Sequence, residues 1–106
     1  MPNNSKNPEY VKYVLIEVAT LIEQNQHTLA NQVLMNMNMP NMYVSVAQLA
    51  QELGFKPTKS EMRKLGRLVA KEPLKRRMTD RWVYFRNGVA VAVVYRLCLE
   101  LNISTL

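Results

Sequence analysis

Hydrophobic side chains recur with helical spacing near the N-terminus of the chain. Over residues 8–25 they form one stripe: Val11, Val14, Leu15, Val18, Leu21 and Ile22. A repeat of three and four positions predicts an amphipathic helix, and Pro8 suits its first turn. The same spacing over residues 28–37 predicts a second helix.

The C-terminal stretch combines signals for two kinds of structure. Asn87-Gly88 is a strong hairpin signal, and valines alternate with alanines just after it, which is typical of a strand over residues 89–95. The apolar run nevertheless continues to residue 103 without a Gly or Pro, which is too long for a strand. We expect a C-terminal helix over residues 88–103 with Asn87 as its N-cap, and the strand is the alternative.

The centre of the chain predicts a strand, a short helix, a turn and a second helix, in that order. Tyr43-Val44 is a short β-type run, and Ser45 is a suitable N-cap for a helix over residues 46–53. Gly54 supplies the left-handed residue that commonly ends a helix.

Thr58 and Glu61 have the spacing of a capping box, so the second of these helices should begin at Lys59 and extend to residue 71. At about 100° per residue, its apolar arc contains four residues: Met62, Leu65, Leu68 and Val69. The opposite arc is cationic: Lys59, Arg63, Lys64, Arg67 and Lys71. Gly66 and Ala70 lie at the edge of this basic arc, where a bulky ligand has room to approach the backbone.

Two β-type runs follow, over residues 74–78 and 81–85, and Thr79-Asp80 separates them. This pattern predicts a β-hairpin within residues 74–86 that carries arginines near its tip. We therefore expect a fold that is mostly α with a small β-hairpin. It should form a single domain over residues 8–106, preceded by a disordered, Asn-rich arm over residues 1–7.

Positive charge is concentrated in the second half of the chain. The 106 residues carry a formal net charge of +6. Residues 1–54 contribute −2 and residues 55–106 contribute +8, and eleven of the twelve basic residues of the second half lie within 56–86. A field of one sign this concentrated indicates a polyanionic partner, and the alternative is a solvated helix face.

Few side chains suit catalysis or metal binding. Cys98 and His27 are the single cysteine and histidine, and neither has a partner at ligand spacing. The methionines of residues 35–42 suit either Cu(I) ligation or flexible filling of an irregular connection. We expect no enzyme activity, cofactor, metal site or small-molecule effector. No apolar run reaches the ~18 residues of a membrane span, so we expect no membrane partner and a cytoplasmic protein.

The order strand, helix, turn, helix and arginine-rich hairpin resembles the winged helix-turn-helix superfamily. The resemblance covers residues 43–85, under half of the chain, and three segments carry it: 44–54 (VSVAQLAQELG), 60–69 (SEMRKLGRLV) and 81–85 (RWVYF). It implies a winged helix-turn-helix core, with the helix-turn-helix over 45–71 and a wing over 74–86. The helices predicted from periodicity flank this core, over 8–37 at its N-terminal side and over 88–103 at its C-terminal side.

The resemblance also implies that the helix beginning at Lys59 lies in the major groove of double-stranded DNA, while the hairpin touches the backbone or minor groove. An α-helix fits that groove, arginine can bind guanine bidentately, and lysine more often contacts phosphate. We expect four base-contacting residues: Ser60, Arg63, Lys64 and Arg67. We expect seven backbone-contacting residues: Lys56, Lys59, Lys71, Lys75, Arg76, Arg77 and Arg81.

These expectations together predict a sequence-specific, dimeric transcriptional repressor that acts by occupying its operator. A C-terminal helix that is apolar almost all round exceeds what one small monomer usually buries. We therefore expect a homodimer interface that includes six residues: Tyr13, Ile16, Val93, Tyr95, Leu97 and Leu101. The alternative is that the N-terminal helix covers the C-terminal helix within one subunit.

Two other functions are compatible with the basic half. An assembly module or inhibitor with a winged helix would use it on an acidic protein. RNA binding would instead use base stacking on exposed Tyr43, Trp82 or Tyr84. DNA binding should weaken steeply with salt, whereas a protein partner should show a shallower dependence.

Overall fold

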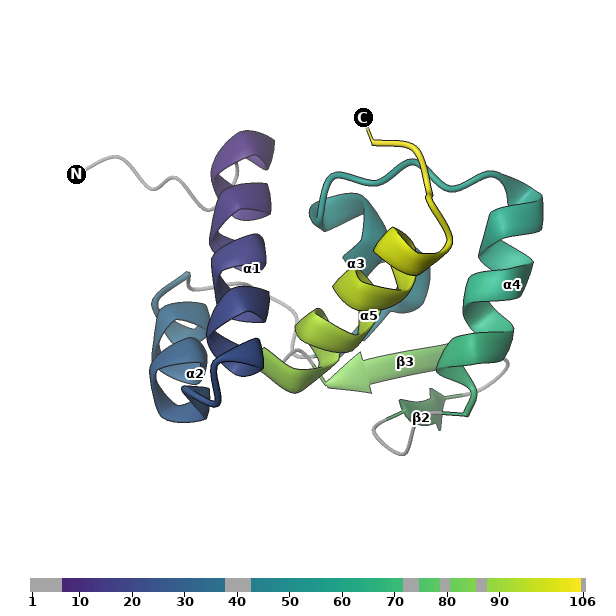
Figure 1. Cartoon of the computed structure of the whole chain (residues 1–106). Helices are drawn as coiled ribbons and strands as arrows, with labels where there is room; N and C mark the ends of the chain where they lie inside the picture. Colours follow the sequence, from purple (N-terminus) through teal and green to yellow (C-terminus); the bar gives the residue numbers. More distant parts are fainter. Residues whose placement is uncertain (1–6, 38–42, 72–74, 79–80, 86–87, 106) are drawn as a thin grey trace.

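The computed structural model describes residues 7–37, 43–71, 75–78, 81–85 and 88–105, and of residues 43, 75–78 and 81–85 it describes the backbone (Figure 1). Helices dominate it, as predicted, and a small sheet accompanies them. The element order is α1 (Pro8–Glu23), α2 (His27–Asn36), β1 (Tyr43–Ser45), α3 (Val46–Glu52), α4 (Lys59–Val69), β2 (Lys75–Met78), β3 (Arg81–Phe85) and α5 (Gly88–Glu100).

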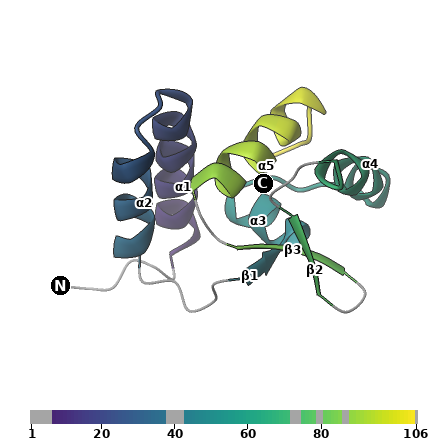
Figure 2. The ribbon, with the colours of Figure 1, turned by 90° about the horizontal axis from the view of Figure 1, so that it is seen from below.

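α1 and α2 lie side by side at one end of the molecule (Figures 1 and 2). Asn7 is the N-cap of α1, and its side chain accepts a hydrogen bond from the Glu9 N–H at 3.0 Å. Asn7 is therefore part of the helix start and not of the predicted arm, of which residues 1–6 lie outside the described residues. α1 ends two residues before the predicted end because Asn25 has a left-handed φ of 60°.

α3 begins at the predicted residue and ends at Glu52, one residue before the predicted end, with Leu53 as its C-cap. The Ser45 hydroxyl accepts a hydrogen bond from the Gln48 N–H at 3.1 Å and so caps the helix. Gly54 has a φ of 91°, a conformation that glycine adopts without steric cost. The Phe55 N–H then donates to the Ala50 carbonyl at 3.0 Å, which completes the C-terminal cap.

The three strands form one antiparallel sheet in the order β1-β3-β2. Val44 pairs with Tyr84, and Arg76 pairs with Val83, so β3 lies between the other two strands. The predicted hairpin is confirmed as β2 and β3. Its predicted tip, Thr79-Asp80, lies outside the described residues.

α5 is a helix and not a strand, and it runs through the middle of the molecule (Figure 2). It contacts all four other helices, with α1 and α2 on one side and α3 and α4 on the other. Its expected cap, Asn87, lies outside the described residues. Within the described residues, Asn31 of α2 accepts a hydrogen bond from the Gly88 N–H at 3.1 Å and satisfies the first donor of α5.

This central position corrects part of the predicted dimer interface. Val93 and Leu97 are only 7% and 5% exposed, and they belong to the core of a single chain. Neither is available to a second copy, because both are already buried where α5 packs among the other helices of the same chain. The intrachain alternative therefore accounts for these two residues.

The other four residues of that predicted interface lie nearer the surface. Ile16, Tyr95 and Leu101 are partly buried and pack against the core. Tyr95 places its ring 5.9 Å from that of Phe55, measured between centroids. Tyr13 is the most exposed of the six, at 63%, and the Lys12 ammonium lies 5.6 Å from the centroid of its ring.

The chain turns back on itself after α5. Asn102 has a left-handed φ of 53°, and the Ile103 N–H donates to the Cys98 carbonyl at 3.1 Å. This is a Schellman motif, and it directs the last residues toward the connection between α3 and α4. There Phe55 and Thr105 form an isolated antiparallel bridge.

Candidate functional site

A capping box fixes the N-terminus of α4 at the residue that the sequence predicted. The Glu61 N–H donates to the Thr58 hydroxyl at 3.2 Å, and the Thr58 N–H donates to the Glu61 carboxylate at 2.8 Å. Two backbone donors that a helix start leaves unsatisfied are thus paired. The helix ends at Val69, two residues before the predicted end, because the Lys71 N–H already donates to the Leu68 carbonyl in a tighter turn.

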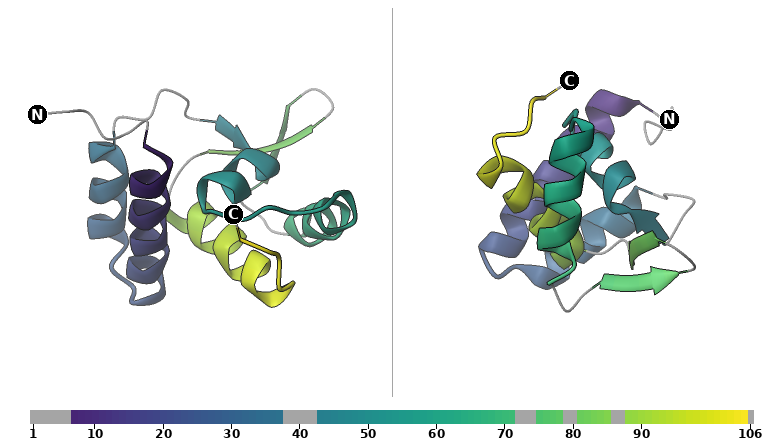
Figure 3. Two further views of the ribbon diagram at one scale, coloured as in Figure 1. Left: turned by 90° about the horizontal axis from the view of Figure 1, so that it is seen from above. Right: turned by 90° about the vertical axis from the view of Figure 1, so that its right-hand side faces the viewer.

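The apolar arc of α4 faces the rest of the protein, as predicted. Leu65 and Val69 are fully buried, and Met62 and Leu68 are partly buried against the core. α4 lies at the opposite end of the molecule from α1 and α2 (Figures 1 and 3). Its outer side therefore faces solvent along the whole helix.

That outer side carries the cationic face, which we define as Lys59, Arg63, Lys64, Arg67 and Lys71. All five side chains are exposed, and so is Ser60 between them. No ion pair joins any of the five to a carboxylate in the described part of the chain. The Glu61 carboxylate of the same helix is engaged by the Thr58 N–H instead. The carboxylates of the described residues therefore leave the positive charges of this face unneutralised.

The residues predicted to contact DNA fall into two groups. Those of α4, together with Lys71 just after it, are all exposed, and Lys56 is exposed in the connection between α3 and α4. The remaining four lie in the hairpin: Lys75, Arg76 and Arg77 in β2, and Arg81 in β3. Only the backbone of these four is described, and likewise for Tyr43, Trp82 and Tyr84, on which RNA stacking was predicted to depend. Since three residues separate Lys71 from β2, the hairpin begins within about 15 Å of the end of the cationic face.

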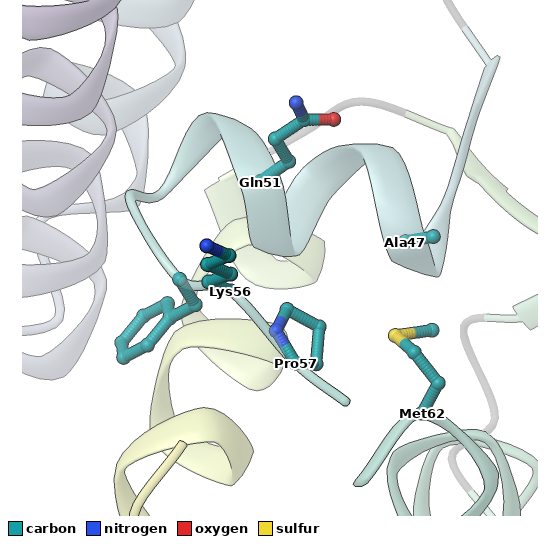
Figure 4. Close-up of a pocket in the computed structure, with 6 residues that line it drawn as sticks. Ala47, Gln51, Lys56, Pro57 and Met62 are labelled. Atoms are coloured by element: carbon teal, nitrogen blue, oxygen red, sulfur yellow. The ribbon is translucent and has the colours of Figure 1, made fainter. Parts of the chain in front are cut away.

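A pocket of about 340 Å³ opens between α3 and the start of α4 (Figure 4). Its walls come from the two helices and the turn between them: Ala47, Gln51, Phe55, Lys56, Pro57 and Met62. The sequence did not predict this pocket, although it predicted the turn between the two helices from which Phe55, Lys56 and Pro57 line it. Lys56 is the only titratable group among the lining residues, so the pocket has no pair of groups for acid–base catalysis.

The single cysteine is a core residue. Cys98 is completely buried, and burial, with a smaller contribution from the charge of Glu61, raises the pKa of its thiol to about 12. A thiol with so high a pKa stays protonated at neutral pH and is a poor nucleophile or metal ligand.

Neither His27 nor the methionine stretch forms a recognisable site in the described residues. His27 is exposed at the start of α2, and no three His, Cys, Asp or Glu side chains of the described ranges gather into a metal-binding group. Met35 is exposed and Met37 is buried, while the remaining methionines of residues 38–42 lie outside the described residues.

No protein-family model, curated protein or solved structure matches this chain. Functional inference therefore depends on the cationic face and its surroundings. Within the ranges that the structure describes, every helix is too short or too polar to cross a bilayer.

Proposed function

We propose that this protein binds double-stranded DNA through the cationic face of α4. The observation that carries the proposal is that five exposed cations, four on one side of α4 and Lys71 in the turn after it, have no carboxylate partner in the described residues. The opposite side of the same helix is anchored by Leu65 and Val69. A row of exposed cations whose charge no described carboxylate balances, at the edge of a small protein, suits the phosphates of a nucleic acid.

The shape of α4 favours duplex DNA over other polyanions. An α-helix with its side chains is about 10–12 Å across, and the major groove is about 12 Å wide. Arg63 and Arg67 are four residues apart and therefore about 6 Å apart along the helix axis, a distance of roughly two base-pair steps. We assign these two, with Ser60 and Lys64, to base edges. Lys56, Lys59 and Lys71 are assigned to phosphates.

The arrangement around α4 supports a winged helix-turn-helix core. The chain runs from α3 through the turn at Gly54 to α4 and then to the β2–β3 hairpin. β1 pairs with β3 on the side opposite β2, so all three strands form one sheet. In this proposal the hairpin is the wing, and its four cations contact the DNA backbone. Occupancy of an operator by the chain would then repress transcription in the cytoplasm. Tyr13 is the residue best placed to pair two copies on a two-fold symmetric operator.

Binding to a pool of random duplex DNA, measured by fluorescence anisotropy at several salt concentrations, tests the proposal. Bound DNA is recovered and sequenced. We expect affinity to fall with salt on a log–log slope of about −0.9 for each phosphate contacted, and a motif to be enriched. Absence of binding at low salt would refute DNA binding, and a shallow slope would favour an acidic protein partner.

Matched variants separate the cationic face from charge in general. Arg63→Ala is expected to cost about 1–3 kcal/mol in binding and to relax the preference at one base pair. Arg96→Ala is the control, because Arg96 is also exposed but lies on α5, with its Nε 3.7 Å from the Glu100 carboxylate. Equal effects of the two substitutions would contradict the assignment of Arg63. Removing Arg76, Arg77 and Arg81 together should weaken binding to all sequences alike.

A further inference from the structure

The C-terminal residues of the chain pack against the connection that leads into α4. The Lys56 N–H donates to the Ser104 carbonyl at 2.7 Å, and Phe55 and Thr105 face each other across the antiparallel bridge. Ile103 is 5% exposed and anchors the segment in the core. Figure 1 shows this segment rising from the end of α5 beside the α3–α4 connection.

We infer that residues 103–105, the C-terminal strap, set the orientation of the cationic face. The strap holds Lys56, and α4 begins only three residues later, at Lys59. The opposite side of the same connection is held by Phe55, whose ring is buried and packs near Tyr95. The connection is thus fixed between α5 and the strap, and the start of α4 follows its direction.

α4 needs such an external support because its own packing is limited. Of its eleven residues, only Leu65 and Val69 are fully buried, and both belong to its second half. Met62, the apolar residue of the first turn, is partly exposed and lines the open pocket next to Lys56. Apart from the contact that Met62 makes with the core, the first turn of α4 is therefore held in place through the connection and the strap.

The inference has two parts, of which only the second depends on the proposed function. The first part is geometric: the strap orders the connection and the first turn of α4. The second part is functional: an α4 that is free to tilt presents its cations to DNA in the bound geometry for a smaller fraction of the time. Apparent affinity falls in proportion to that fraction.

Two variants remove the strap by different routes, and a third is the matched control. Deleting residues 104–106 removes the Ser104 carbonyl but keeps Ile103 in the core. Asn102→Val places a β-branched residue at a φ of 53° and so redirects the strap. Asn102→Gly accepts that φ without strain and should leave the strap in place.

The first measurement is made without DNA, by amide hydrogen exchange and residual dipolar couplings in NMR. In the deletion and in Asn102→Val, we expect the Lys56 amide to exchange about tenfold faster and the couplings of α4 to change relative to those of α5. Asn102→Gly should match the wild type. An unchanged Lys56 amide and unchanged α4 couplings in the deletion would overturn the inference.

The second measurement is binding to duplex DNA by fluorescence anisotropy, at a salt concentration at which the wild type binds. We expect about fivefold weaker binding by both strap variants, and wild-type affinity for Asn102→Gly. Reoriented α4 couplings without any loss of affinity would overturn the functional part. If the wild type itself does not bind DNA, the proposed function fails, and the exchange and coupling data alone decide whether the strap orients α4.

Discussion

Gly66→Ala is expected to stabilise the protein, although it changes the middle of the helix that carries the candidate site. Gly66 lies within α4, and its carbonyl accepts a hydrogen bond from the Ala70 N–H at 2.9 Å, as in a regular helix. A Cβ atom added at Gly66 would have no heavy atom within 4 Å, apart from its own helix backbone and chain neighbours. The alanine therefore brings no steric cost.

The magnitude follows from helix propensity alone. A glycine in a helix interior is less favourable than alanine by roughly 0.5–1 kcal/mol, because it loses more backbone freedom on folding. We expect the free energy of unfolding to rise by this amount. For a domain of this size, the midpoint of thermal unfolding should rise by roughly 2–8 °C.

Gly54→Ala is the matched control, because the chemical change is the same. Gly54 has a φ of 91°, which an L side chain rarely adopts, and the new Cβ would lie 2.8 Å from Cδ of Lys12. We expect this variant to be destabilised by about 1–2 kcal/mol, mainly through backbone strain, since the Lys12 side chain can move. The two substitutions should thus shift the unfolding midpoint in opposite directions.

Thermal and urea unfolding, followed by circular dichroism, measure both variants. A lower midpoint for Gly66→Ala would mean that another part of the chain contacts this position, which would refute the placement of α4. The same variant is informative in DNA binding because it keeps all five cations. If the DNA backbone approaches the Gly66 edge of the helix, affinity should fall while the salt slope stays constant, since no phosphate contact is lost.

Three further predictions concern the contacts that hold the helices. Asn31→Ala should cost about 1 kcal/mol in unfolding free energy, because it removes the acceptor of the Gly88 N–H; the exposed neighbour Gln32→Ala should have little effect. Thr58→Ala should cost about 1 kcal/mol and reduce helicity, and Thr58→Ser should restore both, because serine keeps the capping hydroxyl. Burial raises the pKa of Cys98 from 9.0 to about 12, so the unfolded thiol ionises at lower pH than the folded one. The stability that this thiol contributes below pH 9.0 should therefore decline as pH rises toward 12. Urea unfolding should show that Cys98→Ala loses less unfolding free energy than the wild type over that range; an equal loss in both proteins would contradict the role of burial.

Local signals in the sequence predicted the elements around the candidate site well. The Thr58–Glu61 capping box, the Ser45 cap and the Gly54 turn each depend on residues a few positions apart, so their chemistry is visible in the sequence itself. The two arcs of α4 follow from helical geometry, and the structure buries and exposes them accordingly. The ends of α1 and α4 were placed two residues too late and the end of α5 three residues too late. In α4 the basic periodicity continues to Lys71, beyond the last helical residue, whereas α1 and α5 are ended by the left-handed residues Asn25 and Asn102.

Contacts between residues far apart in the chain could not be predicted from such local signals. The cap that Asn31 gives to Gly88 joins residues 57 positions apart, and no spacing rule connects them. The strap depends on the left-handed conformation of Asn102. The only sequence signal for that conformation is the residue type, because asparagine sometimes ends a helix in this way. The apolar circumference of α5 was visible in the sequence, but only its position among four other helices shows that Val93 and Leu97 are covered within one chain.

The central helix comes last in the order of synthesis. α1 to α4 leave the ribosome before α5 exists, at about 5–20 residues per second, and each carries an apolar face that α5 covers in the finished fold. The fully buried leucines Leu15, Leu49 and Leu65, from three different helices, belong to the same core cluster as the buried residues of α5. Packing of the core is therefore completed only after α5 has been translated.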